Sequence, residues 1–362
     1  MRHLATIQRV RSVSPIEGAD NIELVHILGW QCVAAKGAFR PGDLCVYFEI
    51  DSFIPVDKRF EFLRKRSFRN SPILGEGFRL KTAKFRGQIS QGLVMKINEV
   101  FNSDIAYGLQ EGDDVTDALG VKEWEEPIPA VLSGVAKGRR PGWIEHSSEE
   151  RIQSNPDLLE EFRGLEYYIT TKYDGSSHFI AVDDEDHFRF GSHNLELEAM
   201  DIPNSFGKWL ADHDIPRKAV EYKKKLGVTR FYMIGEWCGE GIQKNKLKLK
   251  EPTWFVFTVN ADDRRFPLRG LKEACAFLGV KHVAIEEIGY DLPKKYPTVE
   301  ALLKRAELNA ASVYQGQPEG IVIRPTDSYY TKTVTTEYKT YYKPDKLLSM
   351  KVLNNKYLLK NE

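Results

Sequence analysis

The stretch Glu166-Tyr167-Tyr168-Ile169-Thr170-Thr171-Lys172-Tyr173-Asp174-Gly175 decides how the rest of the chain is understood. Aromatic and β-branched residues fill positions 167–171, which is typical of a β-strand, and Asp-Gly at 174–175 marks a turn. A second β-rich segment, 178–182, leads away from the turn. The pattern predicts that Lys172 lies at the end of a rigid strand. The alternative is an ordinary hairpin turn that carries an exposed lysine.

Size and charge limit the possible architectures and partners. The 362 residues suffice for two domains, because single hydrophobic cores stop growing near about 250–300 residues. Basic and acidic residues balance at 52 each, so a nucleic-acid partner would have to meet a local basic patch. No stretch has the roughly 20 apolar residues of a membrane span, and no signal-peptide core follows the first residues. We expect an intracellular, cytoplasmic protein with no membrane partner, and nothing in the sequence indicates an oligomeric state.

The N-terminal quarter predicts a small β-barrel. Its β-rich segments are separated by glycine and proline turns and cover residues 5–14, 22–28, 30–35 and 44–50. Six basic residues occur between Lys58 and Arg69, with Phe60, Phe62 and Phe68 among them. Basic groups beside aromatic rings suit phosphates and bases of a nucleic acid, although the rings are equally suited to anchoring a solvated loop.

Prolines and glycines concentrate between residues 123 and 142, which is the composition of a linker. We therefore predict two domains, 1–125 and 126–362. Shortly after the linker, Ser147 and Glu150 form a capping-box pattern, which predicts a short helix that contains Arg151.

Six motifs in the second domain resemble, in content and order, those of the nucleotidyltransferases that attach a nucleotide to a lysine. The first is Lys-x-Asp-Gly at 172–175, and the others lie at 189–194, 231–237, 254–259, 318–324 and 348–353. Segments such as Gly29-Trp30-Gln31 and Ser90-Gln91-Gly92-Leu93 resemble the OB-fold module that precedes the catalytic domain in one group of RNA ligases. As a whole the chain resembles the ATP-dependent RNA ligases of the type known from Deinococcus and Naegleria.

The resemblance implies a fold and a set of functional residues. The fold is α+β: an N-terminal OB-fold β-barrel that binds nucleic acid, then a nucleotidyltransferase domain with antiparallel sheets and flanking helices. Lys172 is the implied nucleophile toward ATP, and Lys351 the implied contact to the α-phosphate. Asp174, Glu236 and Glu319 are the implied carboxylates around Mg²⁺ or Mn²⁺. The implied nucleotide-binding residues are Arg151, Thr171, Gly175, His193, Asn194, Phe255 and Phe257.

The sequence departs from the family pattern at three places. His193 follows Ser192 where many relatives have arginine, so the ribose contact stays open between His193 and Asn194. Thr258 stands where the family often has aspartate, and Phe255 and Phe257 are both candidates for stacking on adenine. Lys351 lacks the second lysine that many relatives carry two positions away.

The implied reaction joins an RNA 3′-hydroxyl to a 5′-phosphate, through lysyl-AMP and an adenylylated RNA end, at nicks in duplexes. A DNA ligase and a catalytically silent RNA-binding protein with a ligase-like body are the alternatives. A capping enzyme is disfavoured, because its OB-fold follows the last motif and only 11 residues follow Lys351 here.

Overall fold

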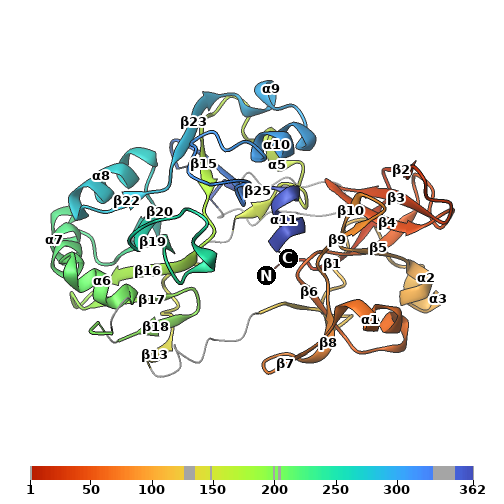
Figure 1. The fold of residues 1–362 in the computed structure, drawn as a ribbon, viewed down its shortest axis with the longest axis horizontal. Helices are drawn as coiled ribbons and strands as arrows, with labels where there is room; N and C mark the ends of the chain where they lie inside the picture. The colour runs from red at the N-terminus through yellow and green to blue at the C-terminus, as the bar shows by residue number, and fades with distance from the viewer. Residues whose placement is uncertain are drawn as a thin grey trace. The chain divides into compact units, whose positions relative to one another are not determined.

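The computed structural model describes residues 2–125, 135–146, 149–198, 200–202, 205–328 and 347–361. The chain divides into two compact units (Figure 1). The first comprises Met1–Ile128, Gln153–Pro156 and Leu358–Glu362, and the second comprises Pro129–Ile152 and Asp157–Tyr357. In the described part of the chain, no helix is both long enough and apolar enough to cross a lipid bilayer.

The first unit consists of short antiparallel strands, and a hydrophobic cluster in it includes Ile7, Val46, Phe48 and Phe78. One sheet has the order β1-β5-β11 and a second the order β2-β3-β4; β9 pairs with β10, and a fourth sheet has the order β12-β6-β8-β7. The strands are β1 Ala5–Arg9, β2 Ser12–Pro15, β3 Ile22–Ile27, β4 Trp30–Ala35, β5 Leu44–Phe48, β6 Ser52–Pro55, β7 Phe68–Ser71, β8 Gly75–Arg79, β9 Thr82–Phe85, β10 Gln88–Gln91, β11 Leu93–Lys96 and β12 Lys122–Glu123. Its helices are η1 Lys58–Leu63, α1 Arg64–Ser67, α2 Ile97–Val100 and α3 Ser103–Ala106.

The predicted strands of this unit are present, but they do not close into a barrel. Among the described residues the strands form four separate sheets, and no ladder of hydrogen bonds runs from the first strand round to the last. A closed barrel needs strands long enough to tilt and pair on both sides. Here no strand exceeds six residues, so each ladder ends where the chain turns into the next sheet.

The second unit contains two sheets, each with its own core. The larger has the order β13-β18-β17-β16-β19-β20-β21, with β22 beside β20, and the smaller has the order β14-β25-β24-β15-β23. The strands of the larger sheet are β13 Ala136–Arg139, β16 Ser176–Val182, β17 Phe188–Ser192, β18 Leu195–Leu197, β19 Phe231–Cys238, β20 Thr253–Ala261, β21 Arg264–Arg265 and β22 Lys281–His282. Those of the smaller sheet are β14 Glu150–Arg151, β15 Glu166–Lys172, β23 Ile285–Tyr290, β24 Gly320–Pro325 and β25 Met350–Leu353.

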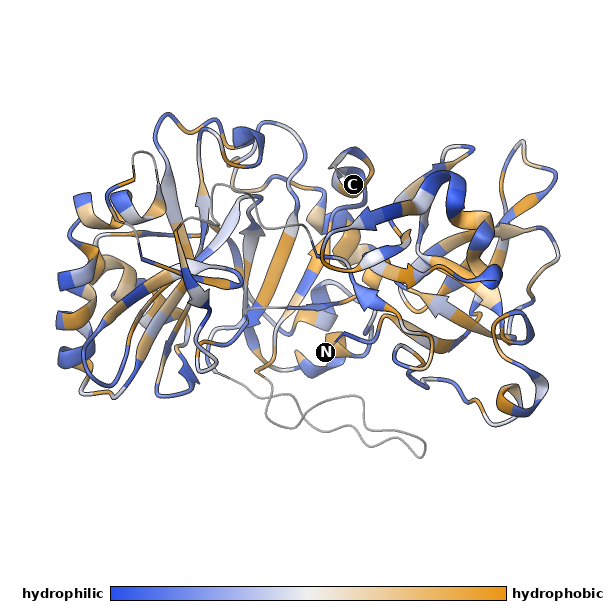
Figure 2. Cartoon of the chain, turned by 90° about the horizontal axis from the view of Figure 1, so that it is seen from below, coloured by the Kyte–Doolittle hydropathy of each residue, from blue (hydrophilic) through white to orange (hydrophobic). Residues whose placement is uncertain are grey.

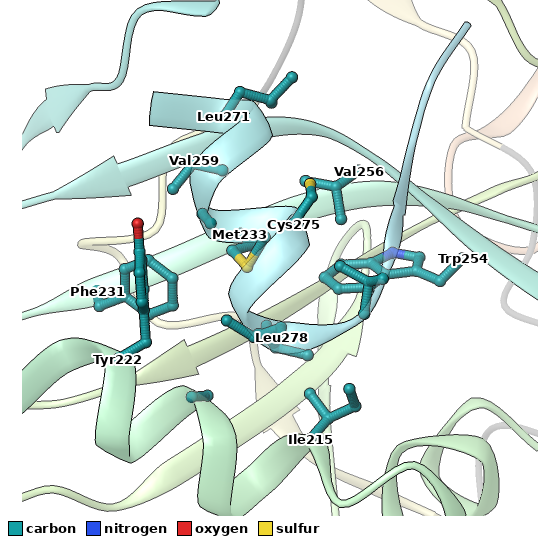
Figure 3. Close-up of a cluster of buried hydrophobic side chains, with 14 of the residues drawn as sticks. Ile215, Tyr222, Phe231, Met233, Trp254, Val256, Val259, Leu271, Cys275 and Leu278 are labelled. Carbon is teal, nitrogen blue, oxygen red and sulfur yellow. The ribbon is translucent and has the colours of Figure 1, made fainter. Parts of the chain in front are cut away.

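Helices cover one face of the larger sheet. The amphipathic helices α7 and α8 lay Ile215, Tyr222, Leu271 and Leu278 against strand residues such as Met233 (Figure 3). The helices of this unit are α5 Leu158–Glu161, α6 Phe206–Asp212, α7 Ile215–Leu226, η2 Gln243–Asn245, α8 Leu268–Leu278, α9 Leu292–Lys295 and α10 Val299–Ala306; α11 Asn355–Asn361 begins in this unit and ends in the other. Apolar and polar residues interchange along many of the strands (Figure 2).

One local prediction in this unit is wrong. Arg151 lies in strand β14 and not in a helix, because Glu150 and Arg151 pair in parallel with Met350 and Lys351 of β25. Strand pairing with a distant segment has overridden the local capping signal, whose Ser147 lies outside the described residues. The alternative interpretation of 172–175 as an ordinary hairpin turn is excluded, because β15 and β16 belong to different sheets and do not pair with each other.

Candidate active site

Lys172 lies where the chain crosses from the smaller sheet to the larger one. It is the last residue of β15 and is paired with Gly320 of β24, whereas β16 starts only four positions later in the other sheet. Its Nζ atom lies 2.6 Å from Oε1 of Glu319, the residue directly before β24. The amine and an acid from a distant segment are therefore brought together by two neighbouring strands.

Glu236 reaches the same turn from β19 of the larger sheet. Its Oε1 accepts a hydrogen bond of 3.1 Å from the backbone N–H of Gly175. Only glycine fits at position 175, because a Cβ there would lie 2.5 Å from the carbonyl oxygen of Trp237. Burial, together with the charge of Glu319, raises the pKa of Glu236 to about 7, although the charge of Lys172 opposes this change.

The protonation of Lys172 is set by its acidic neighbours. Burial alone would lower its pKa, but the charges of Glu319, Glu236 and Asp174 outweigh this effect and raise it. In the site without nucleotide, Lys172 is therefore an ammonium ion. It must lose a proton before it can act as a nucleophile.

A second lysine, which the sequence analysis did not single out, pairs with Asp174. The Nζ atom of Lys246 contacts Oδ2 of Asp174 and also donates to the Tyr357 hydroxyl at 3.0 Å. Lys246 follows η2 in a loop with lysines at 244, 246, 248 and 250, and that alternation resembles an ordinary solvated loop. The contacts with Asp174 and Tyr357 distinguish Lys246 from its neighbours.

The three predicted metal-binding acids do not form a closed cage. No group of three or more Asp, Glu, His and Cys side chains in the described ranges is arranged to hold a metal ion. Asp174 is engaged by Lys246, and Glu319 is engaged by Lys172. The arrangement is compatible with a hydrated ion such as Mg²⁺, which keeps several waters and needs few direct carboxylate ligands.

Tyr314 fixes the backbone of the turn and was also missed from the sequence. Its hydroxyl accepts from the N–H of Asp174 at 2.6 Å and donates to the carbonyl of Lys172 at 3.1 Å. Its ring meets that of Tyr173 edge-on, with the centroids 6.1 Å apart. The turn that carries the lysine is thus held by a buried side chain 142 residues further along the chain.

Glu319 is positioned by the close approach of β24 and β25. Gly320 has φ +157°, and a Cβ there would lie only 2.2 Å from the carbonyl oxygen of Val352. The backbone N–H of Asn354 donates to the carbonyl of Glu319 at 2.9 Å. The side-chain amide of Asn354 donates to the backbone carbonyl of Pro318. Gly320, the glycine of the motif at 318–324, therefore permits the close contact between β24 and β25.

Arg151 and Lys351 lie on the smaller sheet in register with each other. Lys351 pairs with Arg151 on one side and with Val322 on the other, and Val322 pairs with Thr170. Residues directly opposite one another in a sheet share a face, so these positions lie on the face that also carries Lys172, two residues after Thr170. The core of the smaller sheet fills the opposite face.

Thr171 points to that opposite face. Its side chain is buried, and its hydroxyl donates to Oε1 of Glu286 at 2.6 Å. Glu286 in turn pairs with Arg305 at 2.8 Å, and both of these side chains are inaccessible to solvent or nearly so. The hydroxyl of Thr171 therefore belongs to a buried polar network behind the strand that carries Lys172.

The two candidate adenine-stacking rings lie on β20 on the face away from α7 and α8. Phe255 is only 8% exposed, and its ring meets that of Tyr173 edge-on at 4.8 Å. Phe257 is more exposed and packs between two clusters, one containing Tyr173 and the other Ile144. Phe257 therefore has the more accessible ring.

His193 and Asn194 connect β17 to β18. The carbonyl of Asn194 accepts from the N–H of Arg140 at 3.0 Å, and the ring of His193 lies 4.8 Å from that of His146. Burial, Arg140 and His193 together lower the pKa of His146 to about 4.

The basic segment of the first unit is only partly available to a ligand. Phe60 is a core residue, whereas Phe62 is 62% exposed. Arg59 pairs with Asp57, and Arg64 pairs with Glu61. Phe60 thus has the anchoring role that the sequence left open, and Phe62 remains accessible.

Comparisons with known proteins match both units. The OB-fold domain family matches residues 4–97, and the RNA ligase family matches residues 165–343. No curated protein matches the sequence.

Solved structures of one protein match the whole chain. A Naegleria gruberi RNA ligase solved with pyrophosphate is 32% identical, with a TM-score of 0.79, and the match covers 99% of this chain and 98% of that one. A variant of the Naegleria gruberi enzyme solved with ATP and Mn is 31% identical, with a TM-score of 0.80 and coverage of 99% and 98%. Another variant, solved with AMP and Mn, is 32% identical, with a TM-score of 0.80 and full coverage of both chains. With an OB-fold domain ahead of a lysine, two glutamates and an aspartate gathered at the junction of two sheets, the chain belongs to the RNA ligase family.

Proposed function

We propose that this protein is an ATP-dependent RNA ligase that seals nicks in duplexes through a covalent lysyl-AMP intermediate. The observation that carries the proposal is the contact of 2.6 Å between Lys172 and Glu319, beside Glu236, at the crossing between the two sheets. In this proposal residues 1–125 bind nucleic acid and residues 126–362 carry out catalysis, in the cytoplasm where ATP is present.

The residues around Lys172 fit a nucleotide and a divalent cation. Glu236, Glu319 and Asp174 would hold a hydrated Mg²⁺ or Mn²⁺, which is the ion type present in the Naegleria gruberi structures with ATP. A bound cation would offset the acids that keep Lys172 protonated and would neutralise charge on the phosphate oxygens. Arg151 and Lys351 supply further positive charge on the same sheet face.

The proposed reaction has three steps, and each is an attack at phosphorus. The neutral amine of Lys172 forms a P–N bond to the α-phosphate of ATP, and pyrophosphate leaves. The AMP is then transferred to the 5′-phosphate of an RNA end, which frees the lysine. Finally a 3′-hydroxyl attacks that phosphate, forms the new phosphodiester bond, and releases AMP. Glu236, with a pKa of about 7, can carry a proton at neutral pH while the amine alternates between its free and bonded forms.

Covalent labelling tests the first step. The protein is incubated with radiolabelled ATP and Mg²⁺ and then separated by denaturing electrophoresis. We expect a labelled band for the wild type, none for Lys172→Ala, and full labelling for Lys304→Ala, an exposed lysine on α10. Labelling that survives in Lys172→Ala would refute the assignment of the nucleophile, and a wild type that does not label would favour the silent RNA-binding alternative.

A panel of nicked duplexes tests the substrate. Each nick carries RNA or DNA on its 3′-hydroxyl side and on its 5′-phosphate side. The proposal expects sealing when the 3′-terminal sugar carries a 2′-hydroxyl, because only that group distinguishes RNA from DNA at a given position. Equal sealing of all-DNA nicks would identify a DNA ligase instead.

A further inference from the structure

A β-bulge interrupts β20 at Phe257. The pairing with β19 shifts between Ile234 and Gly235, which face Thr258 and Val256, so Phe257 has no partner residue on β19. Val256 packs in the core beneath α7 and α8, whereas Phe257 packs on the other face. A bulge bends its strand and changes the direction of a side chain, so this one sets the orientation of the Phe257 ring.

Arg324, from the other sheet, forms hydrogen bonds to the bulge. It lies on β24 in register with Tyr168 of β15. Its Nη1 donates to the backbone carbonyl of Phe257, and its Nη2 donates to Oγ1 of Thr258 at 3.2 Å. One guanidinium thus binds both bulge residues, at the position where relatives often have an aspartate and this chain has Thr258.

A carboxylate from a third segment neutralises Arg324. Glu149 accepts from Nη2 of Arg324, and the two side chains are only 10% and 7% exposed. Burial would raise the pKa of Glu149, but Arg324, Arg265 and the Ser349 hydroxyl bring it down to about 2. Glu149 is therefore ionised throughout the working pH range. The guanidinium donates to a carbonyl, a hydroxyl and a carboxylate from two separate nitrogens of a planar fork, a geometry that the single nitrogen of a lysine ammonium does not reproduce.

We propose that Arg324 is a positioning residue for base recognition: it fixes the bulge so that the Phe257 ring, and not that of Phe255, forms the platform on which adenine stacks. This inference rests on the proposed function. Phe255 is closed off by its contact with Tyr173, and the less buried ring is the one whose backbone Arg324 binds. Arg324 does not touch the nucleotide in this scheme and acts through Phe257.

A double-mutant cycle tests the inference through the KM for ATP in lysyl-AMP formation. Base stacking on an aromatic ring is worth about 5- to 150-fold in affinity, so we expect Phe257→Leu to raise this KM on the order of tenfold. Arg324→Lys should raise it similarly while kcat at saturating ATP changes less than about threefold. The double variant should be no worse than Phe257→Leu alone, because the two residues act on one contact. Multiplicative effects, or an unchanged KM in Arg324→Lys, would overturn the proposal.

Two controls keep the cycle decisive. Lys223→Met removes another buried cation that binds a backbone carbonyl and a carboxylate, those of Asp183 and Asp186, and it should leave the KM unchanged. If Arg324→Lys does not fold, as judged by circular dichroism, Thr258→Val takes its place and should give a rise in KM of about two- to fivefold that vanishes in the Phe257→Leu background. Failure of wild-type labelling would refute the proposed function. Normal wild-type labelling, with effects of the two substitutions on KM that multiply in the double variant, would refute only the role of Arg324.

Discussion

Replacing Glu236 by glutamine should stabilise the protein at alkaline pH and leave it unchanged at acidic pH. The pKa of this carboxyl is about 7 in the folded protein and about 4.5 in a solvated chain. Between these two values the unfolded chain is ionised and the folded protein is protonated, so folding takes up a proton. Wild-type stability therefore falls as the pH rises through this window. Glutamine mimics the neutral acid and can still accept from the Gly175 N–H, so it escapes this loss.

The size of the effect follows from the two pKa values. Their difference corresponds to about 3 kcal/mol, because one pKa unit is worth about 1.36 kcal/mol. Glu236 is only partly buried, and solvent screening reduces the expected gain to about 2 kcal/mol above pH 7. For a unit of this size, that gain raises Tm by about 4–8 °C.

Thermal unfolding at pH 5 and pH 8 measures the effect directly. The difference in Tm between Glu236→Gln and wild type should grow by several degrees between the two conditions. Glu240→Gln serves as the matched control, because Glu240 is exposed just beyond the same strand and its variant should show no such growth. A difference for Glu236→Gln that is the same at both pH values would refute the claim that this acid is neutral in the folded site.

Three further predictions follow from other contacts. Lys246→Met removes the partner of Asp174 and should slow lysyl-AMP formation by about tenfold in single-turnover labelling, since a charge-assisted contact is worth about 1.5 kcal/mol or more. The control variant Lys248→Met should not slow this step. Arg305→Met leaves Glu286 buried without its cation and should cost about 3–5 kcal/mol in urea unfolding; an unchanged midpoint would contradict this. Gly320→Ala forces a Cβ against Val352 and should lower both Tm and labelling, which a parallel scan and assay would show.

The features that could be predicted from the sequence are those encoded locally. The run of aromatic and β-branched residues predicts the β15 strand, and Lys172 lies at its end as predicted. The apolar strand before Glu236 and the β-branched strand after Glu319 follow the same rule. Strand propensity and alternation act over a few residues, so a single sequence reveals them.

The features that were missed depend on contacts between distant segments. Tyr314 contacts Lys172 from 142 positions further along the chain, and Lys246 contacts Asp174 from 72 positions further along. The residues next to Tyr314 and Lys246 in sequence do not indicate either contact. Arg151 has the local pattern of a helix, but pairing with β25 decides its structure. A bulge such as the one at Phe257 is likewise invisible in the residues that form it, because it is defined by the register of the strand beside it.

The crossing of the chain between two sheets has a consequence for how activity can be used. Each sheet of the second unit encloses its own hydrophobic cluster, and the reactive groups are divided between them: Lys172 and Glu319 belong to one, and Glu236 to the other. In the proposed function, neither half alone would supply all of the groups needed for labelling with adenylate. Incorporation of radioactive adenylate during refolding would then report the time at which both halves have folded and docked.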